Sequence, residues 1–235
     1  DLMFKTDSIA PEQIPYLGLL KSVLGYVDTE NYTYGELFNE INANTGGINC
    51  GVEVFDRADS TEEFQAMFSV RGKALYTKMD FLFKMIGEIL NSSKLEDTKR
   101  LYEIVASVKS RAQVNLTGAG HSTAVLRAAA YSSPMAAFQD EMAGIGYYQF
   151  IEKLEKDFEQ RKEETVEELC KLMKKILRPE NFMISYTGER ESLETVQKLA
   201  GAVKAGLGTE PVEKSEEKLT CTKKNEGFKT SGQVQ

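Results

Sequence analysis

The fold class is decided by two neighbouring stretches, Ile48-Asn49-Cys50-Gly51-Val52-Glu53-Val54 and Phe64-Gln65-Ala66-Met67-Phe68-Ser69-Val70. In each stretch apolar residues recur at every second position, which is the period of a strand with one buried face. A polar segment from Asp56 to Thr61 separates the two stretches. The pattern therefore predicts an antiparallel hairpin, one face of which packs against the rest of the domain.

The segments before the hairpin predict a short strand and two helices. Residues 2–9 are expected to form the strand, and residues 11–27 the first helix. Thr33 and Glu36 have the spacing of a capping box. We therefore predict a second helix that starts after Thr33 and runs to about Ala43.

Helical periodicity dominates the chain after the hairpin. Apolar residues recur every three or four positions in helical segments that we expect at about 79–90, 101–112, 124–131 and, punctuated by glycines, 134–177. A strand over 181–187 and a last helix over 191–205 complete the order. The sequence therefore predicts an α+β fold, with a small, mainly antiparallel sheet and helices packed on one face.

The composition changes at residue 209, after which Lys, Glu, Thr and Gly dominate. We expect one domain over residues 1–208. Residues 209–235 are expected to be a linker and the truncated start of a next domain. The chain begins at Asp1 and not at a methionine, so we expect it to be a fragment of a larger protein.

The charge balance argues against two classes of partner. Lys and Arg number 29 against 36 Asp and Glu, a net charge of -7. Nucleic acids and anionic membrane surfaces need clustered cations, whereas Lys73, Arg127, Arg178 and Arg190 are expected to be isolated. No apolar run approaches the roughly 20 residues that span a bilayer. Three scattered cysteines favour free thiols and a reducing compartment such as the cytoplasm.

Candidate catalytic groups are few. The one histidine, His121, precedes Ser122, but adjacent residues seldom face each other in the geometry of a catalytic triad, and no orienting acid is identifiable. Zinc needs three or four His, Cys or carboxylate ligands. The paired glutamates within 163–168 are expected to be the solvated face of an amphipathic helix. We therefore expect no catalytic residue and no metal ligand in this chain.

Three strings of sequence, taken in order and spacing, resemble one known family. They lie at 17–27 with 32–37, at 120–134 with 144–150, and at 225–228 (Asn-Glu-Gly-Phe). Together they span nearly the whole chain. The chain resembles one domain of the pitrilysin/insulinase family of zinc metallopeptidases, in particular its presequence-protease type.

In that family the catalytic domain carries an H-x-x-E-H motif on its first helix, where two His bind zinc and the Glu activates water. The corresponding positions here are Leu17, Leu20 and Lys21, none of which has the chemistry of the motif. The resemblance implies a non-catalytic copy, the third of four related domains. Zinc would then be bound elsewhere in the full-length protein, and residues 209–235 would lead into the fourth domain.

The resemblance implies a role in containment. Two halves of such a protein close around a chamber that takes unfolded peptides and excludes bulk water. This domain would form a wall of the chamber, with the sister domains and the peptide as its partners. His121, Ser122 and Tyr131 are the expected chamber-lining residues. Two alternatives are a non-enzymatic scaffold domain of the same fold, as in the core proteins of respiratory complexes, and an unrelated α+β interaction module.

Overall fold

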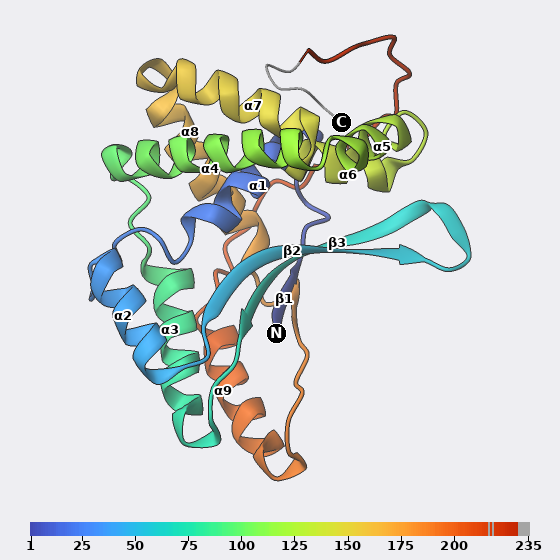
Figure 1. Cartoon of the computed structure of the whole chain (residues 1–235). Coiled ribbons are helices and arrows are strands. Elements are labelled where there is room, and N and C mark those ends of the chain that lie inside the picture. The colour runs from blue at the N-terminus through green and yellow to red at the C-terminus, as the bar shows by residue number, and fades with distance from the viewer. Residues whose placement is uncertain (216, 218, 230–235) are drawn as a thin grey trace.

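The computed structural model of the chain describes residues 1–215, 217 and 219–229. Within them lies one antiparallel sheet with strand order β2-β3-β1-β4 (Figure 1). The strands are β1 (Leu2–Lys5), β2 (Ile48–Arg57), β3 (Ser60–Gly72) and β4 (Phe182–Ile184). The first strand lies between β3 and β4, with Phe4 opposite both Phe68 and Phe182.

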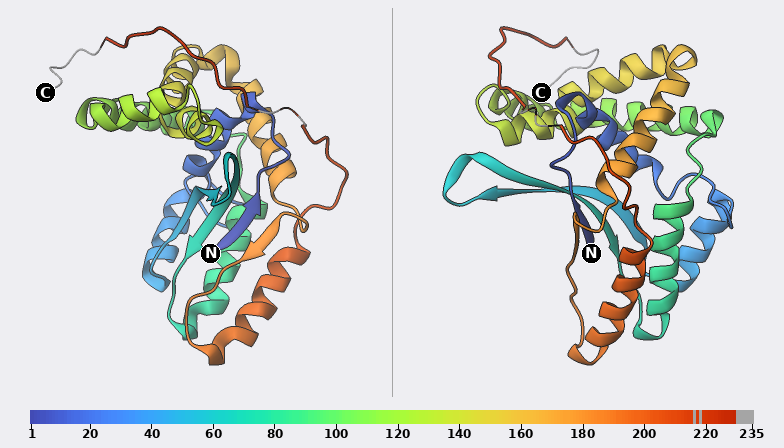
Figure 2. Two further views of the ribbon diagram at one scale, coloured as in Figure 1. Left: turned by 90° about the vertical axis from the view of Figure 1, so that its right-hand side faces the viewer. Right: turned by 180° about the vertical axis from the view of Figure 1, so that it is seen from behind.

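The predicted hairpin is confirmed. β2 and β3 pair with Cys50 opposite Val70 and Val52 opposite Phe68, so the alternating apolar residues share one face. The far end of the hairpin extends beyond the helices (Figure 2). Phe55, near that end, is 47% exposed.

One face of the sheet is buried beneath the helices. Leu2 and Phe4 of β1 are 3% and 0% exposed, and their partners Val70 and Phe68 are fully buried. On the opposite face Met183 is 45% exposed. The predicted α+β class, with helices packed on one face of a small antiparallel sheet, is therefore confirmed.

The helices gather in two groups (Figure 1). The upper group consists of α4 (Thr98–Gly118), α5 (Gly120–Ala129), α6 (Pro134–Ala143), α7 (Ile145–Lys156) and α8 (Phe158–Ile176). The lower group consists of α2 (Tyr34–Asn44), α3 (Met79–Ser92) and α9 (Leu193–Ala205). Helix α1 (Ile14–Val23) lies between the sheet and the upper group and contacts α6, α8 and α4. Short 3₁₀ turns precede α1, α3 and α9, at Pro11–Gln13, Tyr76–Lys78 and Arg190–Ser192.

Helix α1 is packed unusually closely because of Gly18. A Cβ atom at this position would lie 2.6 Å from the carbonyl oxygen of Met142 and 2.7 Å from the ring of Tyr147. Only a residue without a side chain allows the backbones of α1 and α6 to approach so far. Helix α1 is therefore a buried helix, and Leu17 and Leu19 on it are both 0% exposed.

Some predicted element boundaries are confirmed and others are wrong. The Thr33 hydroxyl accepts from the Glu36 amide at 3.3 Å and the Glu36 carboxylate accepts from the Thr33 amide at 2.9 Å, so the capping box is present. The helical stretch predicted over 134–177, punctuated by glycines, is divided into α6, α7 and α8; the break at Gly144 falls at one of those glycines, and the break at Asp157 has no counterpart in the prediction. The first helix ends at Val23, before Gly25 with its φ of 86°.

After α9 the chain turns back along the domain toward the upper helices (Figure 2). Arg178 donates to the Glu210 carbonyl at 2.6 Å, and the Ser215 amide donates to the Ser8 carbonyl at 3.1 Å. We call residues 209–229 the tail, so far as the structure describes them. The tail therefore connects the end of α9 with the helices at the opposite end of the domain.

Candidate functional site

The three positions that we predicted to correspond to the zinc motif lie on α1. Leu17 and Leu20 are 0% and 1% exposed and belong to the hydrophobic core. Lys21 is half-buried, and an ammonium group has no lone pair to offer a metal. Zinc requires nitrogen, sulfur or oxygen ligands, so these residues do not fit a zinc ion. No three His, Cys, Asp or Glu side chains gather into a possible metal site anywhere in the described residues.

A groove of about 580 Å³ opens beside the end of α1. We call it the α1–β2 groove, because its walls are the last turn of α1, helix α2 and strand β2, and Arg111 of α4 also lines it. Lining residues include Lys21, Tyr26, Phe38, Cys50, Glu53 and Arg111. Tyr26 and Phe38 are 49% and 55% exposed. The groove thus combines apolar rings at the rim with two cations.

Strand β2 presents a free edge in this groove. It is the outermost strand of the sheet and pairs only with β3 among the described strands. In an antiparallel pair every second residue directs its N–H and C=O away from its partner strand. Residues 48–53 line the groove, and within the described residues no backbone hydrogen bond joins them to anything except β3. The edge can therefore accept another extended chain.

The cations of the α1–β2 groove have no acidic partner among the described residues. Neither Lys21 nor Arg111 forms a salt bridge with a described residue, whereas Glu53 forms a salt bridge with Arg71 at 3.4 Å. Desolvation by burial lowers the pKa of Lys21. Desolvation also raises the pKa of the Cys50 thiol to about 12, so the thiol stays protonated and is not a nucleophile. The two cations without acidic partners and the free strand edge suit the groove to binding a negatively charged, extended ligand.

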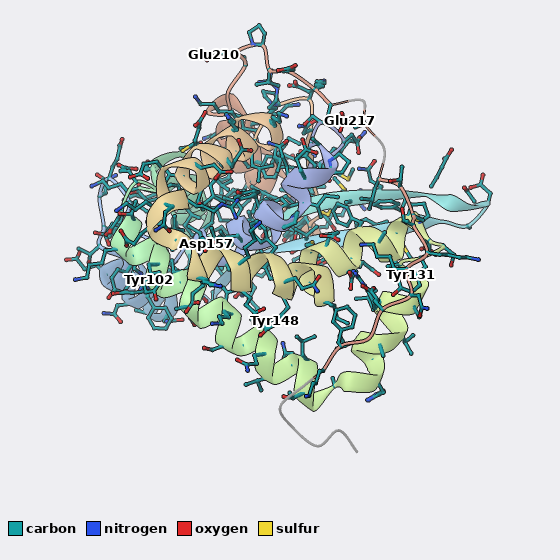
Figure 3. The ribbon with its side chains drawn as sticks, turned by 90° about the horizontal axis from the view of Figure 1, so that it is seen from above. Tyr102, Tyr131, Tyr148, Asp157, Glu210 and Glu217 are labelled. Atoms are coloured by element: carbon teal, nitrogen blue, oxygen red, sulfur yellow. The ribbon has the colours of Figure 1, made fainter. Side chains whose placement is uncertain are left out.

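A second groove, of about 680 Å³, lies among the upper helices. We call it the tail groove, because residues 226–229 of the tail form one wall. The other walls come from α4, α5 and α7, with Leu116, Ala124, Tyr131 and Tyr148 among the lining residues. Figure 3 shows Tyr131 beside the tail and Tyr148 at the space between α7 and α4.

Arg127 of α5 is at the centre of the tail groove, and its side chain is 10% exposed. It donates to Asp140 at 2.5 Å and to the two carboxylate oxygens of Glu226 at 2.6 and 3.2 Å. The Tyr131 hydroxyl donates to Glu226 at 2.5 Å. These hydrogen bonds, with that of Arg127 first, lower the pKa of Glu226 to about 2. The same carboxylates raise the pKa of Arg127.

The residues expected to line a chamber occupy different positions. Tyr131 lines the tail groove. His121 and Ser122 lie on α5, but both are exposed and neither is among the residues of either groove. Arg127 pairs with Asp140 and Glu226, and Arg178 pairs with Glu180 at 2.6 Å, so the partners of both arginines are carboxylates.

Sequence reasoning missed Arg127 and Arg111 as site residues. Partners of Arg127 lie 13 and 99 residues away along the chain, so no local pattern points to them. A signal did exist at Asn225-Glu226-Gly227-Phe228, which stands out as a motif within the polar tail. In the described part of the chain, no helix combines the length and apolar character needed to cross a membrane.

Comparisons with known proteins identify the family of the chain. The family described as associated with peptidase M16, subfamily C, matches residues 1–154. Protein HypA of Clostridium perfringens is 32% identical over the whole chain, which covers 24% of that protein. The mitochondrial presequence protease of Yarrowia lipolytica is 29% identical over 66% of the chain and 16% of its own length. Presequence protease 1 of Arabidopsis thaliana, chloroplastic/mitochondrial, is 25% identical over 84% of the chain and 18% of its own length.

The chain thus spans about a quarter or less of the length of these relatives. The relatives named presequence protease are peptidases of the M16 family, which confirms the resemblance to presequence-protease-type members seen in the sequence. The chain belongs to the family associated with peptidase M16, subfamily C, as a presequence-protease-like domain.

Proposed function

We propose that this chain is a non-catalytic domain of a larger zinc metallopeptidase that degrades unfolded peptides, and that it forms part of the wall of the substrate chamber. The observation that carries the proposal is the replacement of the motif residues on α1 by Leu17, Leu20 and Lys21, two of which are core residues. The chain alone is then inactive and binds no zinc. Zinc in a separate catalytic domain would activate water for peptide hydrolysis.

The α1–β2 groove is the surface that we assign to the peptide. An extended peptide can add to the free edge of β2 through backbone hydrogen bonds, which are independent of the peptide's sequence. Lys21 and Arg111 would favour peptides with carboxylates nearby. Tyr26 and Phe38 offer apolar contact at the rim. The sister domains of the same polypeptide would supply the opposite wall.

His121, Ser122 and Tyr131 belong to this proposal as further residues that face the chamber. His121 and Ser122 are exposed on α5, at the end of the upper helices. They would contact the peptide only when the sister domains close around it. A scaffold domain without any associated peptidase activity shares the same replaced motif, so the two functions must be separated by experiment.

The test compares the full-length protein with the 235-residue chain. Zinc is measured by elemental analysis, and cleavage of an unstructured peptide is measured with and without a chelator. We expect about one zinc and chelator-sensitive cleavage in the full-length protein, and neither in the chain. A full-length protein without zinc and without activity would favour the scaffold function.

The role of the groove is tested in the full-length protein by Lys21→Met combined with Arg111→Gln. We expect a KM for a glutamate-rich peptide raised by about tenfold with kcat nearly unchanged, since these residues contribute binding and no chemistry. Lys5→Met is the matched control, because Lys5 is exposed on β1 and lies outside the groove. An unchanged KM in the double variant would remove the groove from the proposal.

A further inference from the structure

The guanidinium of Arg127 has more hydrogen-bond donors than Asp140 alone accepts from. Asp140 is 1% exposed and accepts hydrogen bonds from the Ile145 and Gly146 amides at 3.0 and 3.1 Å as well as from Arg127. Its two oxygens are therefore shared with the first turn of α7. A guanidinium has five N–H donors, and the Nε and Nη2 atoms of Arg127 donate to Glu226 and not to Asp140.

Glu226 therefore completes the pairing of a buried cation. A buried charge without full pairing is costly, and a bidentate carboxylate is the geometry that a guanidinium fork binds best. Tyr131 adds a third hydrogen bond to the same carboxylate. Together these contacts form a site for one carboxylate, built from side chains of the domain and filled by the tail.

Phe228 supplies the second part of the contact. Its ring lies with its centroid 5.7 Å from the guanidinium carbon of Arg127, within the range of a cation–π interaction. The ring also lines the tail groove with apolar residues of α4 and α5. Gly227 separates the two side chains, and a Cβ atom at Gly227 would have no neighbour within 4 Å. The carboxylate and the ring therefore contact Arg127 from the same short segment.

We propose that the tail groove is a specific docking site for residues 226–229 of this chain, with Arg127 as the residue that recognises Glu226 and Phe228. At neutral pH the segment stays docked and holds residues 226–229 against the upper helices. The ligand class is an acidic residue followed by glycine and an aromatic residue. This inference concerns the chain itself and holds whether or not the proposed peptidase function is correct.

The test uses limited trypsin digestion of the 235-residue chain, followed by mass spectrometry. Lys223, Lys224 and Lys229 flank the docked residues and provide cleavage sites. For each variant we also measure the cleavage rate of a free peptide of residues 220–235 that carries the same substitution. The rate for the free peptide is divided by the rate for the chain, which removes any direct effect of the substitution on trypsin. The ratio is the protection conferred by docking.

The variants are Glu226→Gln, Phe228→Ala and the control Glu213→Gln. Glu213 is an exposed tail carboxylate without a salt bridge among the described residues. We expect protection of about tenfold or more at Lys229 in the wild-type chain and in Glu213→Gln, falling at least about fivefold in the other two. All are expected to keep the same far-ultraviolet circular dichroism, since Glu226 and Phe228 lie outside the core.

Two results would overturn the proposal. A wild-type tail that is cut as fast as the free peptide would show that the segment is not docked. Equal protection in wild type and Glu226→Gln would show that Arg127 does not recognise the carboxylate.

Discussion

The two grooves of this domain have similar volumes, about 680 and 580 Å³, but opposite electrostatic states. In the tail groove the buried cation Arg127 is paired with Asp140 and Glu226. In the α1–β2 groove Lys21 and Arg111 have no acidic partner among the described residues, and the edge of β2 is unpaired there. The chain itself therefore pairs the buried cation of the tail groove. In the α1–β2 groove, the cations and the strand edge are available to bind a ligand from outside the chain.

The same difference has a physical cause in the two kinds of cation. A guanidinium stays charged under all ordinary conditions, so burying Arg127 requires carboxylates nearby. An ammonium can lower its pKa when it is desolvated, as Lys21 does. The domain can therefore fold with Lys21 unpaired, but it is not expected to fold stably with Arg127 unpaired.

The largest effect is expected from Asp140→Ala in the tail groove. The change removes a carboxylate that is 1% exposed and leaves the Nη1 group of Arg127 and the amides of Ile145 and Gly146 without this acceptor, so that Arg127 keeps only Glu226. We expect the free energy of unfolding to fall by about 3–5 kcal/mol, as for other broken buried ion pairs. Urea denaturation measures it. Asp80→Ala, on an exposed turn of α3, is the control, and a loss below about 1 kcal/mol for Asp140→Ala would refute the contrast between the grooves.

An effect of opposite sign is expected from Lys21→Met in the α1–β2 groove. Because burial disfavours the charged form of Lys21, removing the charge should leave stability unchanged or raise it by up to about 1 kcal/mol at pH 7. The pKa of Lys21 is lowered in the folded chain, so the free-energy cost of burying the charged ammonium disappears as pH rises from the lowered value to about 10.4, the value in an unfolded chain. Any gain in stability from Lys21→Met should therefore vanish near pH 10.4. Urea midpoints at about pH 7 and 10 measure it, and a clear loss of stability at neutral pH would show that Lys21 has an unseen partner.

The smallest effect is expected from acid on the tail groove. The pKa of Glu226 is about 2 when docked and about 4.3 when free. Docking is therefore at full strength above about pH 4.3 and weakens as pH falls toward 2. The charged and titratable groups facing Glu226 are Arg127 and Tyr131 of α5 and the turn after it, Asp140 and Glu141 of α6, Tyr148 and Glu152 of α7, and Lys224 and Lys229 of the tail.

The chain contains no tryptophan, so Phe228→Trp provides a single fluorescent reporter of this acid effect. We expect its anisotropy to fall between about pH 4.3 and pH 2, before any change in far-ultraviolet circular dichroism. With Glu226→Gln added, the transition should be absent and the anisotropy low throughout. Identical titrations with and without Glu226→Gln would contradict the assignment. The change in global stability should stay below about 1 kcal/mol, because Glu226 is near the surface.

Much of the fold could be predicted from sequence because it depends on local patterns. The hairpin follows from the two-residue period around Val52 and Phe68, and the start of α2 follows from Thr33 and Glu36. Glycines in the sequence mark the first of the two breaks between α6, α7 and α8, whereas the second, at Asp157, was not predicted. The first of them depends on Asp140, which caps α7 through tertiary pairing with Arg127.

The candidate site was less accessible to sequence reasoning. Lys21 was found only through the resemblance to a family whose motif occupies that position. Arg111 is 90 residues further along the chain than Lys21, and only the packing of α4 beside α1 brings both into one groove. The meeting of two residues so far apart along the chain leaves no periodic trace in the sequence.

The most direct test of the central claim, that the α1–β2 groove contacts extended peptide, is a titration of the ¹⁵N-labelled chain with an unstructured glutamate-rich peptide, followed by NMR. The account predicts amide shift changes at Cys50, Val52 and Lys21, with Arg127 and Tyr131 unaffected because the tail occupies their groove. Changes confined to Arg127 and Tyr131, or no change along β2 at about millimolar peptide, would contradict it.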